Sequence, residues 1–408
     1  MLTKSTLSGP KRQHNAMNRS SLSLYLHIPF CRHRCAYCDF NTYTGLGDLQ
    51  QAYALALGQE IAQVGGLPRP GDILPRPVHT IFFGGGTPSL MAAAEIDHIL
   101  QQVRQHFDLH PAAEITMEAN PGTVDAAYLA AIRAAGVNRL SFGVQSAVAE
   151  ELRFLEREHD FAAVVEAMAL SRAAGFDNLN VDLIYGVPGQ TLASWQASVA
   201  AVVALQPEHL SLYCLTIEPG TPMHRRLHQG LFEPPDADLA ADEYAYACTA
   251  LAAAGFEHYE ISNWARPGRA CEHNLTYWRN GEYLGLGAGA HGHAAGCRYA
   301  VVKQPRVYIR RMRSSRPGAY PLSAAVAEQH QLSRPEAMSD TVITQLRLLQ
   351  EGLDLDAFAE QFGEPFQAAY GSVVAQLEGW GLLQQTGRHL RLTERGWFLS
   401  NQVFYRFM

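Results

Sequence analysis

Short runs rich in β-forming residues alternate with amphipathic segments along the first half of the chain. In the segments between the runs, apolar side chains recur at the helical period, as at Tyr53, Leu57, Ile61 and Val64, which is typical of a helix with one buried face. The runs predict strands over residues 22–28, 78–83, 114–119, 139–143, 178–185 and 209–215. Their spacing of roughly 30 residues is the size of a β-α-β unit. We therefore expect an α/β fold with a parallel sheet, either doubly wound or curled into a partial barrel.

Polar or glycine-rich residues follow the predicted strands. A cysteine loop follows the first, and Gly84-Gly85-Gly86-Thr87 follows the second. Further polar side chains lie at or just beyond the next strand ends, at Glu118, Gln145, Arg157 and Asp182. In parallel α/β sheets, ligands bind at the C-terminal ends of the strands. This set suits a ligand with an amine, a carboxylate and ribose hydroxyls, because arginine pairs with carboxylates and a carboxylate accepts from amines.

Taken singly, each of these features also has a structural explanation. The glycines suit a tight strand-to-helix turn, and no Gly-Lys-Ser/Thr follows them, which excludes a P-loop. Each charged side chain could form an ion pair or a helix cap. The functional interpretation depends on the features occurring together.

Three cysteines stand within eight residues, at Cys31, Cys35 and Cys38. Three thiolates can hold three irons of a [4Fe–4S] cluster and leave the fourth iron open to a substrate. A zinc site completed by His27 or His33 is an alternative, and chance clustering is another.

Composition restricts the class of protein. The 408 residues carry a net charge of −7, which gives no general attraction to nucleic acid. Seven cysteines, three of them in one loop, indicate cofactor ligation in a reducing compartment. Residues 1–20 are polar and lack the apolar stretch of a secretory signal, and no run approaches the roughly 18 apolar residues of a membrane span. We expect a mobile leader over 1–20 and a cytoplasmic protein.

The second half of the chain differs from the first. Residues 256–300 are rich in aromatic residues, histidine and glycine, and a basic tract runs from Lys303 to Arg316. After about residue 333 the pattern is helical, and residues 382–393 predict a hairpin around Thr386-Gly387. We therefore expect a barrel over 21–255, a separate region over 256–316 and a mainly helical, winged-helix-like domain over 317–408.

The cysteine spacing, with Tyr37 before the last cysteine and the triple glycine downstream, resembles the radical S-adenosylmethionine (SAM) superfamily. The stretches around Tyr25 to Cys31 and Asp182 to Gly186 look like the branch that contains oxygen-independent coproporphyrinogen III dehydrogenase and the HemW haem chaperones. The resemblance covers roughly residues 22–400. It implies a partial (β/α)6 barrel with a [4Fe–4S] cluster and SAM at its open top.

The resemblance also implies roles for individual residues. Cys31, Cys35 and Cys38 would ligate the cluster, and the open iron would chelate the amino and carboxylate groups of SAM. The expected cofactor contacts are Tyr25, Tyr37, Phe40, Gly84, Gly85, Gly86, Thr87, Glu118, Gln145, Arg157 and Asp182.

Two features distinguish between the activities of this branch. The dehydrogenase pattern has a fourth cysteine where this chain has Phe40. Residues 273–278 match the HNxxYW motif that is associated with haem binding, with His273 as an iron ligand and Tyr277 and Trp278 as flat apolar surface for a porphyrin. Cys271 and His291 are further candidate ligands, and packing of the motif in a core is the structural alternative.

We therefore predict a haem chaperone that delivers haem to haem-requiring, for example respiratory, apoproteins. The alternative is an oxygen-independent coproporphyrinogen III dehydrogenase. Further partners compatible with the resemblance are an electron donor such as flavodoxin or ferredoxin if SAM is cleaved, a second copy of the chain, and a membrane surface that meets the basic tract. We expect no nucleic-acid partner.

Overall fold

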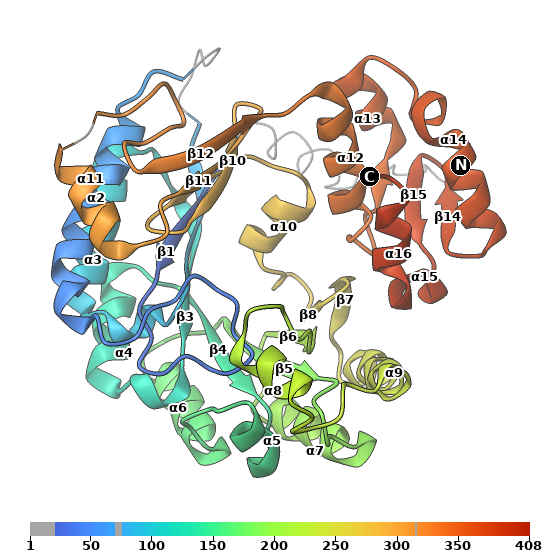
Figure 1. Ribbon diagram of the computed structural model, residues 1–408, viewed down its shortest axis with the longest axis horizontal. Coiled ribbons are helices and arrows are strands. Elements are labelled where there is room, and N and C mark those ends of the chain that lie inside the picture. Colours follow the sequence, from blue (N-terminus) through green and yellow to red (C-terminus); the bar gives the residue numbers. More distant parts are fainter. Residues whose placement is uncertain (1–20, 70–75, 315) are drawn as a thin grey trace, which may run out of the picture.

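The computed structural model describes residues 21–69, 76–314 and 316–408, and Figure 1 shows a large sheet-based unit beside a smaller C-terminal unit. The predicted strands are confirmed. They form β1 (Leu22–Ile28), β2 (Val78–Gly85), β3 (Leu109–Ala119), β4 (Arg139–Gln145), β5 (Leu179–Tyr185) and β6 (His209–Cys214), which run parallel in this order.

Helices cover the outer side of this sheet, as Figure 1 shows along its left and lower edges. They are α2 (Gln50–Gly65), α3 (Ala93–His106), α4 (Ala126–Ala135), α5 (Ala149–Phe154), α6 (Phe161–Ala173) and α7 (Leu192–Ala204). Single 3₁₀ turns precede α2, α3 and α4, namely η1 (Gly47–Leu49), η2 (Pro88–Leu90) and η3 (Pro121–Thr123). β1 is buried at nearly every position, as expected for a parallel strand in the middle of a covered sheet.

The sheet continues beyond the predicted strands. In the described part of the chain it has 12 strands in the order β12-β11-β10-β9-β1-β2-β3-β4-β5-β6-β8-β7, so it is open rather than a closed barrel. The added strands are β7 (Glu257–Glu260), β8 (Asn263–Ala265), β9 (Tyr283–Leu286), β10 (His291–Ala294), β11 (Cys297–Val301) and β12 (Val326–Gln331). The partial-barrel interpretation is therefore confirmed.

The helices of residues 222–314 connect or support these strands. They are α8 (Pro222–His228), α9 (Ala237–Ala253), α10 (Glu272–Trp278) and α11 (Pro305–Ser314). α11 contains most of the basic tract and buries Tyr308, Ile309 and Met312 in the core of the sheet unit. Its Arg310 and Arg313 remain exposed.

The C-terminal unit has a hydrophobic core of its own, in which Val342, Phe358, Leu377 and Leu390 are buried. The predicted hairpin is confirmed as β14 (Leu383–Thr386) and β15 (His389–Leu392), with β13 (Leu353–Asp354) on its other edge. The helices are α12 (Arg334–Gln345), α13 (Leu355–Phe362), α14 (Phe366–Gly379), α15 (Glu394–Phe398) and α16 (Ser400–Tyr405). Helices with a small three-stranded sheet give the winged-helix-like arrangement.

Arg347 joins the two units. Its guanidinium lies 3.1 Å from a carboxylate oxygen of Glu260 in β7, a side chain that is 0% exposed. The same guanidinium lies 4.2 Å from the ring centroid of Trp278 at the end of α10. None of the described helices is both long and apolar enough to cross a bilayer.

The first testable prediction concerns this junction. Arg347→Ala leaves the buried Glu260 carboxylate without its cation, and we expect a loss on the order of 3 kcal/mol in the free energy of unfolding. Equilibrium urea unfolding of the cluster-free chain measures it. The control is Arg153→Ala, which removes an ion pair whose two side chains are 73% and 75% exposed and should cost less than about 1 kcal/mol. Equal losses of unfolding free energy in the two variants would contradict a stabilising role of the Arg347–Glu260 ion pair.

Candidate functional site

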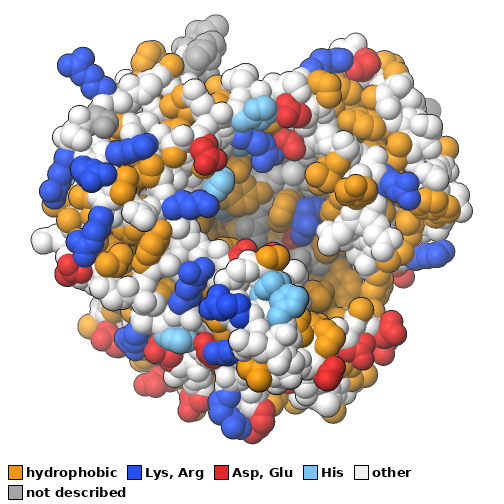
Figure 2. Space-filling model, viewed as in Figure 1, with side chains coloured by type: hydrophobic (Ala, Val, Ile, Leu, Met, Phe, Trp, Pro, Cys, Tyr) orange, Lys and Arg blue, Asp and Glu red, His pale blue; other side chains and the backbone are white. Residues whose placement is uncertain are grey.

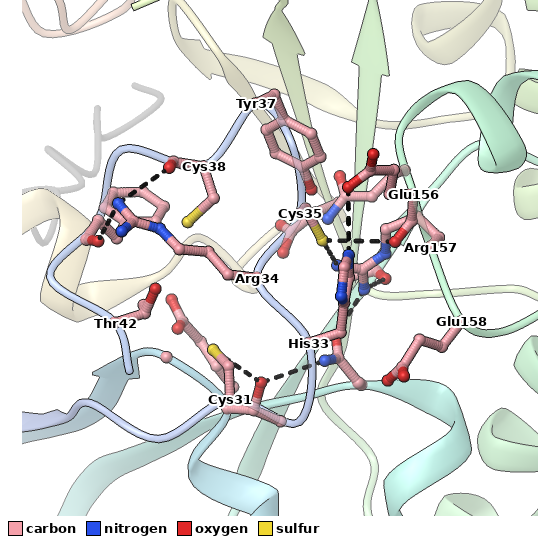
Figure 3. A pocket seen from close by; sticks show the side chains of 18 of the residues that line it. Cys31, His33, Arg34, Cys35, Tyr37, Cys38, Thr42, Glu156, Arg157 and Glu158 are labelled. Carbon is pink, nitrogen blue, oxygen red and sulfur yellow. Dashed lines mark hydrogen bonds and ion pairs between the residues drawn. The ribbon is translucent and has the colours of Figure 1, made fainter. Parts of the chain in front are cut away.

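A cavity of about 520 Å³ lies at the C-terminal ends of the parallel strands. Figure 3 shows the three cysteines around this cavity, with Cys35 beside Arg157. Twelve of the residues singled out from the sequence line this cavity: Cys31, Cys35, Tyr37, Cys38, Phe40, Gly85, Gly86, Thr87, Glu118, Gln145, Arg157 and Asp182. The structure thus brings together residues that are far apart in the sequence.

The cysteine loop is tied to the sheet at its base and in its middle. At the base, the Cys31 N–H donates to the Tyr43 carbonyl at 3.0 Å, and the Tyr43 N–H donates to the Pro29 carbonyl at 2.7 Å. In the middle, the Ala36 carbonyl accepts from the Met223 N–H of α8 at 2.9 Å. These bonds hold three free thiols over the cavity.

Two of the thiols, those of Cys31 and Cys38, lie in an environment that favours their neutral form. Burial raises the pKa of Cys31 and of Cys38, and the other two thiols raise that of Cys31 further. Iron binding would remove these protons, because a thiolate is the ligand form of cysteine. A set of three unpaired thiols on one cavity wall fits a [4Fe–4S] cluster that keeps one iron open.

The two histidines of the zinc alternative are engaged elsewhere. His27 Nε2 pairs with the Asn41 carbonyl at 3.0 Å, and its Nδ1 pairs with the Tyr25 hydroxyl at 3.1 Å. His33 Nε2 lies 3.2 Å from a carboxylate oxygen of Glu156. Both histidines are therefore engaged with other partners, which favours the cluster over the zinc site.

Arg157 connects the loop to the strand ends. It donates to Asn120 Oδ1 at 2.5 Å, to the Gly143 carbonyl at 2.7 Å and to Cys35 Sγ at 3.5 Å. Asn120 in turn donates to Thr87 Oγ1 at 3.2 Å. Sequence reasoning did not select Asn120, although it stands two residues after Glu118 in the same post-strand stretch.

Two half-buried carboxyl groups line the same cavity, those of Glu118 and Asp182. Glu118 accepts from the Gly85 N–H at 3.1 Å, and burial together with the charge of Asp182 raises the pKa of Glu118 to about 8. Asp182 accepts from Asn180 at 2.7 Å and from Ser141 at 3.3 Å, and burial raises its pKa as well. A cationic ligand would lower both pKa values, so this pair suits a sulfonium or an amine.

The residues packed around Gly84, Gly85 and Gly86 leave no room for side chains at these positions. Gly85 has φ +106°. A Cβ there would lie 2.3–2.8 Å from atoms of the His27 ring, which is too close for any side chain. A Cβ at Gly86 would lie 2.7 Å from the carbonyl oxygens of Ile28 and Phe30. Gly84 lies outside the cavity wall, and a Cβ there would lie 3.2 Å from the Glu118 carboxyl. The glycines therefore allow the close approach of β2 to the cysteine loop.

Tyr25 lies in the wall of a second, deeper cavity of about 210 Å³. This cavity shares Glu118 and Asp182 with the first, and its far side is formed by His273 and Tyr277 of α10. His273 and Tyr277 of the HNxxYW stretch thus line the same cavity as the strand-end carboxylates.

A chain of hydrogen bonds fixes the tautomer of His273. The Thr276 hydroxyl donates to the Glu272 carbonyl at 3.1 Å, so Ser23 must donate to Thr276 at 3.0 Å. Thr80 then donates to Ser23 at 2.8 Å. The His273 Nδ1–H therefore donates to Thr80 Oγ1, at 2.7 Å.

With its proton on Nδ1, His273 accepts the Tyr277 hydroxyl proton at Nε2, at 2.8 Å. Its side chain is 1% exposed, and burial with the nearby Arg139 charge lowers its pKa to about 3. Both ring nitrogens are used within the protein.

The other candidate haem residues also differ in exposure. Cys271 is buried, and its thiol donates to Glu114 at 3.4 Å. Trp278 packs at the junction with the C-terminal unit, beneath Arg347. His291 in β10 is exposed.

Comparison with known proteins agrees with this site. The model of the radical SAM superfamily matches residues 25–202, and that of the HemN C-terminal domain matches residues 332–399. A protein of Mycobacterium tuberculosis named heme chaperone HemW is 38% identical over 383 residues, which cover 93% of each chain. The Escherichia coli protein of the same name is 34% identical over 396 residues, which cover 95% of this chain and 98% of the relative. The chain belongs to the HemW family.

Membership of the HemW family places the chain among the radical SAM proteins, for which a [4Fe–4S] cluster and SAM are expected. Among solved structures, coproporphyrinogen III oxidase (HemN) from Escherichia coli has a TM-score of 0.80 and 25% identity, and the match covers 98% of this chain and 93% of that one. The radical SAM fold and the C-terminal domain therefore occur together in both proteins.

The pKa of Glu118 gives the second prediction. The carboxyl group of an unfolded glutamate has a pKa of about 4.5, whereas the pKa of Glu118 in the folded chain is about 8. The stability of the folded chain should therefore fall as pH rises through this window. Glu118→Gln removes the titration and can still accept from the Gly85 N–H. We expect the melting temperature of the variant to rise relative to that of the parent chain between pH 5 and pH 8. If the difference between the two melting temperatures stays constant over this range, the raised pKa of Glu118 is contradicted.

Proposed function

We propose that this protein is a haem chaperone that carries a [4Fe–4S] cluster and SAM, binds haem and delivers it to haem-requiring apoproteins. The observation that carries the proposal is the similarity, over 93% or more of each chain, to relatives named heme chaperone HemW. Two features of the site support it. Phe40 stands where the dehydrogenase pattern has a fourth cysteine, and α10 presents the HNxxYW residues beside the cavity floor.

In this proposal Cys31, Cys35 and Cys38 would hold three irons of the cluster, and the fourth iron would be left open to SAM. Such a cluster can bind SAM and pass an electron to it. The protein residues hold the ligand: Arg157 can pair with the SAM carboxylate, while Glu118 and Asp182 can accept from its amine or ribose hydroxyls. The backbone of Gly85 and Gly86 allows close approach.

Further partners belong to the same proposal. An apoprotein that lacks haem is the recipient, and a flavodoxin- or ferredoxin-like donor supplies the electron if SAM is cleaved. A second copy of the chain is a further partner, and the exposed arginines of α11 could meet an anionic membrane surface.

A second candidate is the coproporphyrinogen III dehydrogenase reaction, favoured by the likeness to HemN. The two functions are separated by one experiment on one sample. The chain is reconstituted anaerobically with iron and sulfide, then titrated with haem by absorption spectroscopy and incubated with coproporphyrinogen III, SAM and a reductant. Haem binding without protoporphyrinogen formation supports the chaperone. Turnover without stable haem binding would reverse the assignment.

The third prediction tests the cluster ligands. Alanine substitution of Cys31, Cys35 or Cys38 should each abolish assembly of a stable [4Fe–4S] cluster, because two remaining thiolates cannot hold it. Iron and sulfide analysis after reconstitution, together with the visible absorption spectrum, measures this. The matched control is Cys248→Ala, which removes a half-buried thiol on α9 and should keep about four irons per chain. A fully loaded Cys38→Ala variant would remove Cys38 from the ligand set.

A further inference from the structure

A third cavity of about 490 Å³ lies on the outer side of the cysteine loop, between that loop and the strands β9 and β10. We call it the His291 groove; its walls include Arg34, Phe40, Tyr277, Tyr283, His291 and Lys303. Its volume is within the roughly 300–1,000 Å³ of small-molecule and cofactor sites. Figure 2 shows a hollow near the middle of the displayed face, with basic, acidic and histidine side chains along its edge.

His291 differs from His273 in having an accessible ring nitrogen, which iron ligation needs. It begins β10 opposite Ala300 of β11, and its side chain is exposed. No described residue forms a hydrogen bond with its ring. His273, by contrast, uses Nδ1 for Thr80 and Nε2 for Tyr277. An accessible imidazole nitrogen is the usual protein ligand of haem iron.

The position of His291 is fixed by contacts to the cysteine loop. Asn41 donates to the Ala288 carbonyl and to the Lys303 carbonyl, each at 3.0 Å. Gly289, with φ +89°, turns the chain against the Asn41 side chain, where a Cβ would clash. The loop that carries His291 is therefore attached to the loop that carries the cysteines.

Aromatic side chains supply the apolar walls. Phe40 is 63% exposed, although it is a large apolar side chain. Tyr277 and Tyr283 meet edge to face with ring centroids 4.6 Å apart. Such walls suit a flat aromatic macrocycle.

The charged groups at the groove suit a dianion. Arg34 donates to the Cys38 carbonyl at 3.2 Å and to the Phe40 carbonyl at 3.3 Å, which holds its guanidinium across the loop. Lys303 supplies a second cation, and Asp39 is a carboxylate on the same lining. Two cations with free N–H groups can pair with the two propionates of a haem.

We propose that haem binds in the His291 groove with the His291 imidazole as an iron ligand, Phe40 and Tyr277 against the porphyrin, and Arg34 and Lys303 at the propionates. This inference rests on the proposed haem-binding function. His273 then acts as a positioning residue: it accepts the Tyr277 hydroxyl proton and orients that ring toward the groove. The HNxxYW motif contributes a wall of the site rather than its metal ligand.

The test compares full-length chains, reconstituted anaerobically, by titration with ferric and ferrous haem. Absorption and electron paramagnetic resonance spectra report the axial ligand. His291→Gly should weaken haem binding by about tenfold or more and remove the histidine-type spectrum, while the cluster content stays unchanged. Adding imidazole to this variant, followed by gel filtration to remove unbound haem, should restore the spectrum, because imidazole can enter the space left by the side chain.

Matched variants separate a ligand from a structural residue. His330→Gly removes a histidine that is also exposed, on β12 of the same sheet, and should leave both affinity and spectrum unchanged. His273→Gln should keep the histidine-type spectrum. Phe40→Ala should weaken haem binding about tenfold, as expected for the loss of one apolar contact surface, without changing the spectrum.

The outcomes are distinct. A His291→Gly chain with parental affinity and spectrum overturns the inference and leaves the haem-chaperone proposal standing. Lost binding that imidazole does not restore overturns the ligand role of His291. If the parent chain binds no haem, the proposed function itself fails, and this inference fails with it.

Discussion

The site depends on two backbone hydrogen bonds between the exit of β1 and the triple glycine. The Gly86 N–H donates to the Ile28 carbonyl and the Thr87 N–H donates to the Phe30 carbonyl, both at 2.8 Å. Any side chain at position 86 would lie 2.7 Å from these carbonyl oxygens, so the pairing requires glycine. These two hydrogen bonds continue the parallel pairing of β1 and β2 past the end of the sheet, to the start of the cysteine loop. The base of the loop that carries the cluster ligands is thereby joined to the strand ends by backbone hydrogen bonds.

Much of this arrangement could be predicted from the sequence, because parallel strands leave a strong local signal. In the runs over 22–28 and 139–143, apolar residues alternate with more polar ones such as Ser23 and Ser141. The apolar residues pack in the core, while the polar residues of the other face, among them Ser141, reach the cavities. Once the strands are placed, their C-terminal ends must meet at one edge. Cys31, Glu118 and Asp182 therefore come together although they are distant in sequence. The hairpin near Gly387 was predictable for a similar reason, since its turn chemistry is local.

The sheet extension was not predictable, because tertiary pairing rather than local pattern creates it. β10 is His-Gly-His-Ala, and β12 is exposed at nearly every position, so neither shows the apolar alternation of a strand. Burial of His273 was hidden as well. A histidine followed by aromatic residues looks the same whether it faces a ligand or a core. Only the folded structure, which places Thr80 at one ring nitrogen and Tyr277 at the other, shows that both nitrogens are engaged.

The shared loop gives the proposed haem site a physical link to the cluster. Arg34, Asp39, Phe40 and Thr42 line both the cluster cavity and the His291 groove. Cluster binding that orders this loop would therefore also order one wall of the groove. Because coupling between two binding sites is reciprocal, haem would stabilise the cluster-bound loop by the same free energy. A chaperone built this way could hold haem in the cluster-loaded state and release it when the loop changes, without any direct contact between the two cofactors.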